Sequence, residues 1–231
     1  MSVGFRVYLK RILPPKELVE AFRSIPASNI SDCMGRLSGL GSEIRLMTRP
    51  TEGNMVGAAL TVKARPGDNL LLHKALNMVM PGDIVVLSNE GDRSQSLMGA
   101  IMATFAKSRG VAGFVLDGPI RDIGYIYDLG VPVYAAGTTP AGPWKEGPGE
   151  INVPVSCGGN VINPGDIIVG DLDGVIVIPR EDAPSLLESV RLFKENDEKK
   201  LEAAEKGTAQ RDWVDKSLLA KGCEIIDDIC R

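Results

Sequence analysis

The sequence predicts a mixed α/β fold with helices on the faces of a sheet, and three observations carry that prediction. Apolar, β-branched segments typical of strands alternate with segments of helical periodicity through the middle of the chain. The signature Pro-Gly-Asp occurs at 81–83 and again at 164–166, each time directly before an apolar run that is typical of a strand. Near the end, DIIVGDLDGVIVIP predicts a β-hairpin that turns at Asp173 and Gly174.

The first half of the chain supplies two helices, a strand and a third helix. Apolar spacing in KELVEAFRSI and in ISDCMGRL predicts two short helices. MVGAALTVKARPG, from Met55, is rich in β-branched and small apolar residues, which favours a strand. LLLHKALNMVM places Leu72, Leu76 and Val79 at helical spacing, so we expect a buried helix there.

The second half continues the alternation. SQSLMGAIMATFAKSRG predicts a helix with Leu97, Ile101 and Phe105 on one face. GFVLDG and PVYAAG are typical of short buried strands, and IRDIGYIYDLG between them predicts a helix with Pro119 in its first turn. The Pro- and Gly-rich stretch 137–150 predicts a loop, and a long charged helix is expected over about 181–206.

The two Pro-Gly-Asp signatures have a local explanation. Pro at the second and Gly at the third position fit a type II turn, which requires a positive φ at the Gly. We interpret them as two similar turns that enter two similar strands. The whole chain is expected to form a single domain, with an N-terminal helical part over 1–54, an α/β core over 55–180, and a C-terminal helix and tail over 181–231.

Composition and charge are those of an ordinary globular protein. The 231 residues are 44% hydrophobic and 24% charged, and the net charge of −4 weighs against nucleic acid as a partner. A membrane helix needs roughly 18 consecutive apolar residues, and no run approaches that length. The N-terminus lacks the pattern of a signal peptide. The four cysteines form no CxxC pair, and a single histidine is present, so we expect reduced thiols in a cytoplasmic protein without zinc.

The stretch VLDGPIRDIG carries the main candidate for chemistry. Arg121 and Asp122 are predicted in the first turn of a helix that follows a strand, where neighbouring residues differ by about 100° around the axis and can flank one ligand. A helix N-terminus also favours an anion, and ligands of α/β sheets gather beyond the carboxyl ends of strands. The alternative is structural: Asp122 faces the helix dipole and Arg121 is a solvated charge.

Other candidates have simpler interpretations. His73 lies in an apolar helix beside Lys74, which favours a packed, hydrogen-bonded histidine over a catalytic base. The acidic residues Glu195, Asp197 and Glu198 are typical of the solvated face of a helix. No glycine-rich nucleotide loop follows a strand, which weighs against methyl transfer.

The segment MGAIMATFAKSRGVAGFVL followed by DGPIRD, together with the two Pro-Gly-Asp strands and DLDGVIVIP, resembles the RraA-like family from about Ile30 to Gly207. That family includes divalent-metal 4-hydroxy-4-methyl-2-oxoglutarate and 4-carboxy-4-hydroxy-2-oxoadipate aldolases. The resemblance implies a β/β/α swivelling-domain fold with helical extensions, assembled as trimers or hexamers. It implies cleavage of a small 4-hydroxy-2-oxo diacid to pyruvate and a second 2-oxo acid, with oxaloacetate decarboxylation through the same pyruvate enolate.

The resemblance also implies roles for individual residues. Asp122 would hold Mg²⁺ or Mn²⁺, and Arg121 would bind the pyruvyl oxygens. The backbone around Gly99, Ala100, Ile101 and Met102 would bind the substrate carboxylate. Lys145 would lie near the distal end of the substrate. Asp197 would reach the metal through water from a neighbouring subunit.

One position departs from the aldolase pattern. The aldolases carry a carboxylate with twenty residues between it and the Arg-Asp pair, and here that position is Ala100. Glu90 or Asp92, in the loop before the helix, is a candidate replacement. The alternative function implied by the family is non-catalytic: a regulator that binds and inhibits an endoribonuclease. The intact pair of Arg121 and Asp122 and the presence of Lys145 favour the enzyme, whereas Ala100 favours the regulator.

Overall fold

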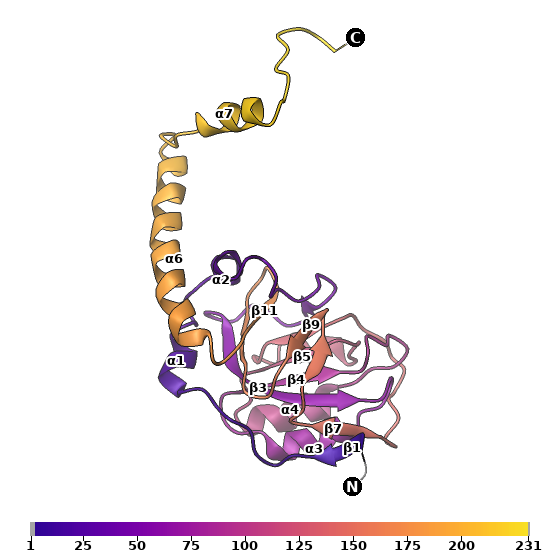
Figure 1. Ribbon diagram of the computed structural model, residues 1–231. Coiled ribbons are helices and arrows are strands. Elements are labelled where there is room, and N and C mark those ends of the chain that lie inside the picture. The colour runs from indigo at the N-terminus through magenta and orange to yellow at the C-terminus, as the bar shows by residue number, and fades with distance from the viewer. Residues whose placement is uncertain (1–2, 231) are drawn as a thin grey trace. The chain divides into compact units, whose positions relative to one another are not determined.

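The computed structural model describes residues 3–230 and divides into two compact units, Met1–Arg191 and Leu192–Arg231 (Figure 1). The first unit holds the sheet and its covering helices. In chain order the elements are β1 (Phe5–Val7), α1 (Lys16–Glu20), α2 (Ala27–Cys33), β2 (Arg45–Leu46), β3 (Met55–Ala64), α3 (Leu70–Met78), β4 (Asp83–Ser88), α4 (Ala100–Ser108), β5 (Gly113–Leu116), α5 (Ile123–Ile126), β6 (Val133–Ala135), β7 (Gly149–Ile151), β8 (Val155–Cys157), β9 (Asn160–Ile162), β10 (Ile167–Gly170), β11 (Val175–Ile178), α6 (Ala183–Glu205) and α7 (Trp213–Ala220).

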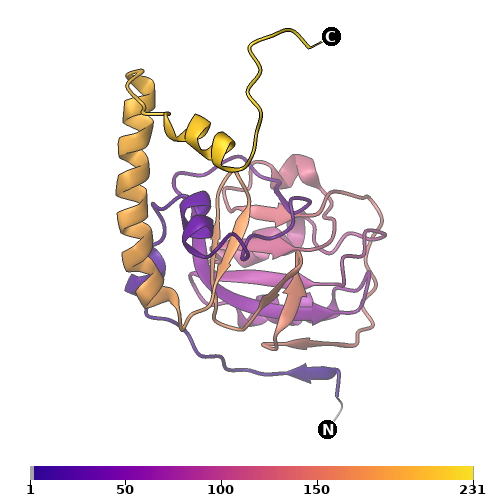
Figure 2. The same ribbon diagram turned by 45° about the horizontal axis from the view of Figure 1, so that its top comes forward.

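The main sheet of the described chain has nine strands. Seven follow the order β1-β7-β3-β4-β5-β6-β2, β10 pairs with β3, and β11 pairs with β10. Strands β3, β4, β5 and β6 are parallel, so their carboxyl ends share one edge. The second half of β3 pairs antiparallel with β7, and its first half pairs antiparallel with β10. In Figure 2 the indigo N-terminal segment runs outside the sheet to β1, which pairs with β7. A mixed α/β fold was predicted, and it is confirmed.

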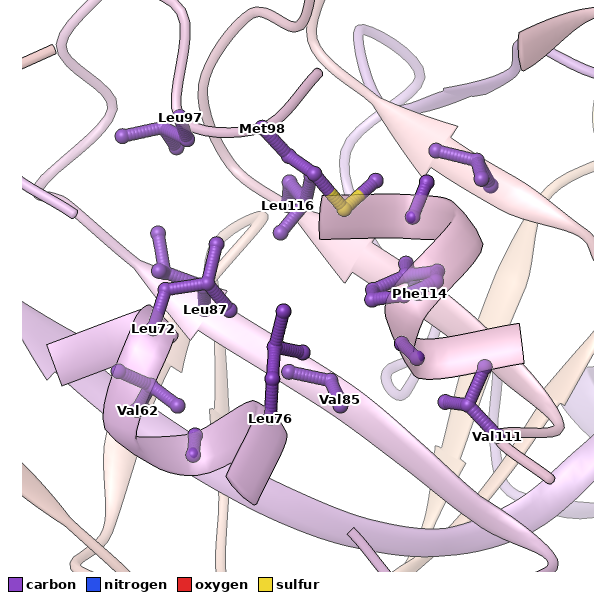
Figure 3. Packing of buried hydrophobic residues seen from close by; sticks show 14 of the residues in the cluster. Val62, Leu72, Leu76, Val85, Leu87, Leu97, Met98, Val111, Phe114 and Leu116 are labelled. Atoms are coloured by element: carbon purple, nitrogen blue, oxygen red, sulfur yellow. The ribbon is translucent and has the colours of Figure 1, made fainter. Parts of the chain in front are cut away.

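Alternating side chains of the central strands feed two separate cores. On one face, Val62, Leu87 and Leu116 pack with α3 and α4, as Figure 3 shows for Leu72, Leu76 and their neighbours. The intervening side chains of the same strands pack on the other face against β8 and β9. Because the parallel strands are covered on both faces, nearly all of their side chains are buried, and their sequences are nearly continuous apolar runs.

Both Pro-Gly-Asp turns meet the N-terminal segment. Their glycines, Gly82 and Gly165, have φ of 92° and 88°, which confirms the type II expectation. Asp83 forms an ion pair with Arg11 in which both side chains are 4% exposed. The backbone oxygen of Ile12 would lie 1.9 Å from a Cβ at Gly165, so a side chain there is excluded. The predicted hairpin is also confirmed, because β10 and β11 pair in antiparallel fashion. Ile167 lies opposite Ile178 at one end of the pairing, and Gly170 lies opposite Val175 at the other.

Two predicted helices begin later than expected. Helix α4 starts at Ala100, because Met98 forms a bridge with Ile120 and Gly99 is extended. Its buried residues are Ala103 and Ala106, whereas Ile101 is 86% and Phe105 43% exposed, so the predicted apolar face was wrong. Helix α5 spans only Ile123–Ile126, so Pro119 lies before it rather than in its first turn.

Candidate active site

Arg121 and Asp122 lie in the segment between β5 and α5, before the helix and not within its first turn as predicted. The Arg121 N–H donates to the Met98 oxygen at 3.0 Å, which fixes this segment against the approach to α4. Asp122 has φ 59° and ψ 36°, the left-handed conformation, directly before α5. Each of the two side chains is 45% exposed, and Nε of Arg121 lies 4.0 Å from Oδ2 of Asp122.

The start of α4 holds the Asp122 carboxylate. The Ala100 N–H donates to Oδ2 of Asp122 at 2.9 Å, so this amide, expected to bind a substrate carboxylate, is used inside the protein. A negative charge near a helix N-terminus is stabilised by the helix dipole. The carboxylate approaches so closely that a Cβ at Gly99 would lie 2.5 Å from Oδ2. A side chain at Gly99 would therefore displace the carboxylate from this position.

A cavity of about 200 Å³ opens between the start of α4, the Arg121–Asp122 segment, α3 and the loop around Lys145. It brings together six of the residues predicted for the site: Gly99, Ile101, Met102, Arg121, Asp122 and Lys145. Asp197 belongs to the second unit, where Lys200 Nζ lies 3.9 Å from its Oδ1. The residues that line the cavity are Asn69, His73, Met98, Gly99, Ile101, Met102, Arg121, Asp122, Pro143 and Lys145.

Asp68 anchors the loop that carries Lys145. This carboxylate is fully buried and accepts hydrogen bonds from the N–H groups of Glu146 at 2.7 Å and Gly147 at 2.9 Å. The backbone of Trp144 forms two hydrogen bonds. Its N–H donates to the Gly67 oxygen at 2.9 Å, and its oxygen accepts from the Asn69 N–H at 3.0 Å. Lys145 is therefore held at the cavity by a loop with buried anchors.

Two polar residues at the start of α3 also line the cavity, Asn69 directly before the helix and His73 within it, and neither was predicted as a site residue. Asn69 is 2% exposed, and its Nδ2 donates to Leu97 O at 2.9 Å. His73 was predicted to be packed and hydrogen-bonded, but its Nε2 is buried without a partner in the part of the chain described. Burial and the Lys145 charge lower the pKa of His73. The signal available in sequence was the four-residue spacing between Asn69, directly before the helix, and His73 within it.

Neither candidate replacement for the Ala100 carboxylate reaches this cavity. Glu90 lines a different cavity, together with Lys63 and Asp117. Oδ2 of Asp92 accepts from both the N–H and the hydroxyl of Ser94. The carboxylate predicted to compensate for Ala100 is therefore not supplied by this loop.

The chain is similar to known proteins in both sequence and structure. The family model RraA-like (Aldolase/RraA) matches residues 27–177, which is more than half of the chain. The chain belongs to the RraA-like family. A protein of Halalkalibacterium halodurans named putative 4-hydroxy-4-methyl-2-oxoglutarate aldolase is 42% identical over 182 residues, 79% of this chain and 86% of that protein.

Solved structures of RraA-like proteins share the fold. Streptomyces coelicolor RraAS2, described as an unusual member of the RNase ES inhibitor RraA protein family, has a TM-score of 0.74 at 28% identity, over 82% of this chain and 98% of that chain. The RNA-processing inhibitor RraA from Thermus thermophilis has a TM-score of 0.61 at 26% identity, over 67% of this chain and 92% of that chain. The expected RraA-like architecture is confirmed. None of the helices among residues 3–230 has both the length and the apolar content needed to cross a bilayer.

Proposed function

We propose that this RraA-like protein is a lyase that cleaves a small 4-hydroxy-2-oxo diacid, or decarboxylates oxaloacetate, through a pyruvate enolate. The observation that carries the proposal is the shared cavity of Arg121 and Asp122, with Lys145 on its wall. A guanidinium, an ammonium and a carboxylate at one small cavity suit a dianionic substrate and one cation. The putative aldolase with 42% identity supports the same activity.

The cavity offers few protein ligands for a divalent cation. No three His, Cys, Asp or Glu side chains among residues 3–230 come together as a metal site, and Asp122 is the one carboxylate on the described cavity wall. Mg²⁺ is commonly held by one or two carboxylates, with substrate and water as the remaining ligands, so Asp122 fits Mg²⁺ or Mn²⁺ in that mode. When bound, such a cation supplies a Lewis acid beside the 2-oxo group.

The protein groups then have distinct tasks. Arg121 binds the pyruvyl oxygens and stabilises the negative charge that develops there, an effect typically worth a few kcal/mol per preorganised donor. The first-turn N–H groups of α4, at Ile101 and Met102, have no acceptor inside a helix and suit the substrate carboxylate. Lys145 pairs with the distal carboxylate.

We also propose that the protein works in the cytoplasm as a homotrimer or homohexamer, with Asp197 donated to the site of a neighbouring subunit. Exposed apolar side chains beside the cavity support a subunit contact: Ile101 is 86%, Phe105 43% and Tyr125 58% exposed. Burying aromatic and aliphatic side chains of this size is a typical driving force for association. Light scattering tests the proposal, and a monomer at micromolar concentration contradicts it.

A regulator without catalytic activity is the second candidate function. Ala100 supports it, because the site lacks the carboxylate that the aldolases carry, and solved relatives include RNase inhibitors of the RraA type. In that case binding to an endoribonuclease is expected without any turnover of 2-oxo acids.

A coupled pyruvate assay separates the two candidates. The enzyme is expected to release pyruvate from 4-hydroxy-4-methyl-2-oxoglutarate or oxaloacetate with Mg²⁺ or Mn²⁺ present, and to lose this activity in Asp122→Asn and Arg121→Met. Asp128→Asn is the matched control, because Asp128 is an exposed carboxylate that pairs with Arg49 outside the cavity. Absence of pyruvate from both substrates, or full activity in Asp122→Asn, refutes the lyase.

A further inference from the structure

Two residues that line the cavity at the start of α3, Asn69 and His73, each carry a buried hydrogen-bond acceptor without a donor among residues 3–230. The side-chain Nδ2 of Asn69 donates a hydrogen bond to the Leu97 oxygen, and its Oδ1 takes no part in that bond. Within residues 3–230, Oδ1 of Asn69 and Nε2 of His73 are both buried and without a hydrogen-bond partner. Asn69 directly precedes α3, His73 lies four positions further on within it, and both line the cavity that holds Arg121 and Asp122.

This wall selects for a ligand that brings a hydrogen-bond donor. A buried polar group without a partner costs about 1–3 kcal/mol, and a ligand that satisfies the group recovers that cost. Carboxylates and keto groups carry no donor and find their partners at Arg121 and Lys145 instead. A hydroxyl group is the donor that distinguishes a 4-hydroxy-2-oxo diacid from oxaloacetate in its keto form.

We propose that His73 is the general base that removes the proton of the substrate's 4-hydroxyl group. The inference rests on the lyase function proposed above. It also explains how the site works with Ala100: the side of the cavity at α4 lacks a proton acceptor, and α3 supplies one in its place.

The step balances without any further reactant. The Nε2 lone pair takes the hydroxyl proton, and the O–H electron pair forms the new C4 carbonyl. The C3–C4 bond breaks, and its electron pair forms the enolate of pyruvate across C2 and C3. The imidazolium then returns its proton to C3, which becomes the pyruvate methyl group, and neutral His73 is regenerated.

The surroundings of His73 keep it available as a base. Burial and the nearby charge of Lys145 lower its pKa, so the imidazole is neutral near pH 7. The other charged groups on the cavity wall are Arg121 and Asp122, whereas α4 contributes apolar side chains. On its own helix, the neighbouring Lys74 is exposed and does not line the cavity.

The test compares two reactions that differ in their need for a base. His73→Gln is expected to lower aldol cleavage by about 100-fold or more, the usual range for loss of a general base. Oxaloacetate decarboxylation starts from an ionised carboxylate and needs no base, so it is expected to fall by less than about fivefold. Lys74→Gln on the same helix is the matched control and is expected to keep both activities.

Because His73 is the single histidine, its imidazole gives one assignable NMR titration in the wild-type protein. The acid limb of the kcat/KM profile for aldol cleavage is expected to follow that titration, and this holds as a test even when His73→Gln fails to fold. Equal loss of both activities, full aldolase activity in the variant, or an acid limb unrelated to the titration overturns the inference alone. A wild type that turns over neither substrate overturns the proposed lyase function as well.

Discussion

Gly99→Ala perturbs the candidate site through a single methyl group. The backbone of Gly99 has φ −136° and ψ −174°, an extended conformation that any residue adopts without strain. The new Cβ would lie 2.5 Å from Oδ2 of Asp122 and 3.1 Å from Nε of Arg121. Contact between a carbon and an oxygen atom needs more than 3 Å, so the carboxylate must move by roughly 1 Å or rotate away.

The expected cost is larger for activity than for stability. Movement of the carboxylate breaks its hydrogen bond from the Ala100 N–H. Because the Asp122 side chain is 45% exposed and can turn to solvent, we expect the free energy of unfolding to fall by less than about 1 kcal/mol. A displacement of about 1 Å at a reacting group can lower turnover about 100-fold, and we expect pyruvate release to fall by that factor.

Pyruvate release and urea unfolding are measured together for Gly99→Ala and for Gly124→Ala. Gly124 is two residues beyond Asp122 in α5, and a Cβ there would meet no atom within 4 Å. The control is expected to keep wild-type activity and to gain up to about 1 kcal/mol of stability from helix propensity. Wild-type activity in Gly99→Ala, or equal loss in the two variants, refutes the reasoning.

Three further predictions concern the surroundings of the site and the scaffold. Asp68→Ala removes the acceptor of two loop amides, so the loop that carries Lys145 loses its anchor. The KM for the diacid substrate should rise, because Lys145 pairs with its distal carboxylate, and the free energy of unfolding should fall by about 2 kcal/mol. Arg11→Met leaves Asp83 buried without its ion-pair partner, and urea unfolding should show a loss of about 3–5 kcal/mol; a loss below 1 kcal/mol contradicts the buried pair. Burial raises the pKa of Asp117, so the protonated form is favoured in the folded state, and stability present below about pH 4 is lost as the pH rises through the folded-state pKa. The stability of Asp117→Asn relative to wild type should therefore rise as the pH increases above about 4, and a difference that is constant with pH contradicts the prediction.

Local patterns in the sequence predicted the scaffold well. The turn requirement of Pro-Gly-Asp and the hairpin at Asp173 and Gly174 depend on a few adjacent residues, and both were found. The apolar runs of the central strands were recognisable because both faces of the sheet are covered.

Tertiary contacts changed the elements next to the site. Met98 bridges to Ile120, which delays the start of α4, and Asp122 takes a left-handed conformation that no sequence pattern indicated. The helical spacing of Ile101 and Phe105 indicated a core face, yet both are exposed. Apolar periodicity alone does not distinguish a core face from an exposed apolar patch.

The candidate site was predictable only where a motif marked it. Arg121, Asp122 and Lys145 were named from DGPIRD and from the family pattern. His73 was assigned to the core because its helix is apolar, and its place on the cavity wall depends on how α3 packs against α4. A burial pattern alone does not show which buried polar atom lacks a partner.

The central claim is that Arg121 and the cation held by Asp122 bind the same pyruvate-like anion. A crystal structure of the protein with Mn²⁺ and oxalate, a planar dianion that resembles the pyruvate enolate, tests it most directly. The claim predicts an anomalous manganese peak at the Asp122 carboxylate and oxalate oxygens within hydrogen-bond distance of the Arg121 guanidinium. Manganese away from Asp122, or oxalate bound without Arg121, would contradict the claim.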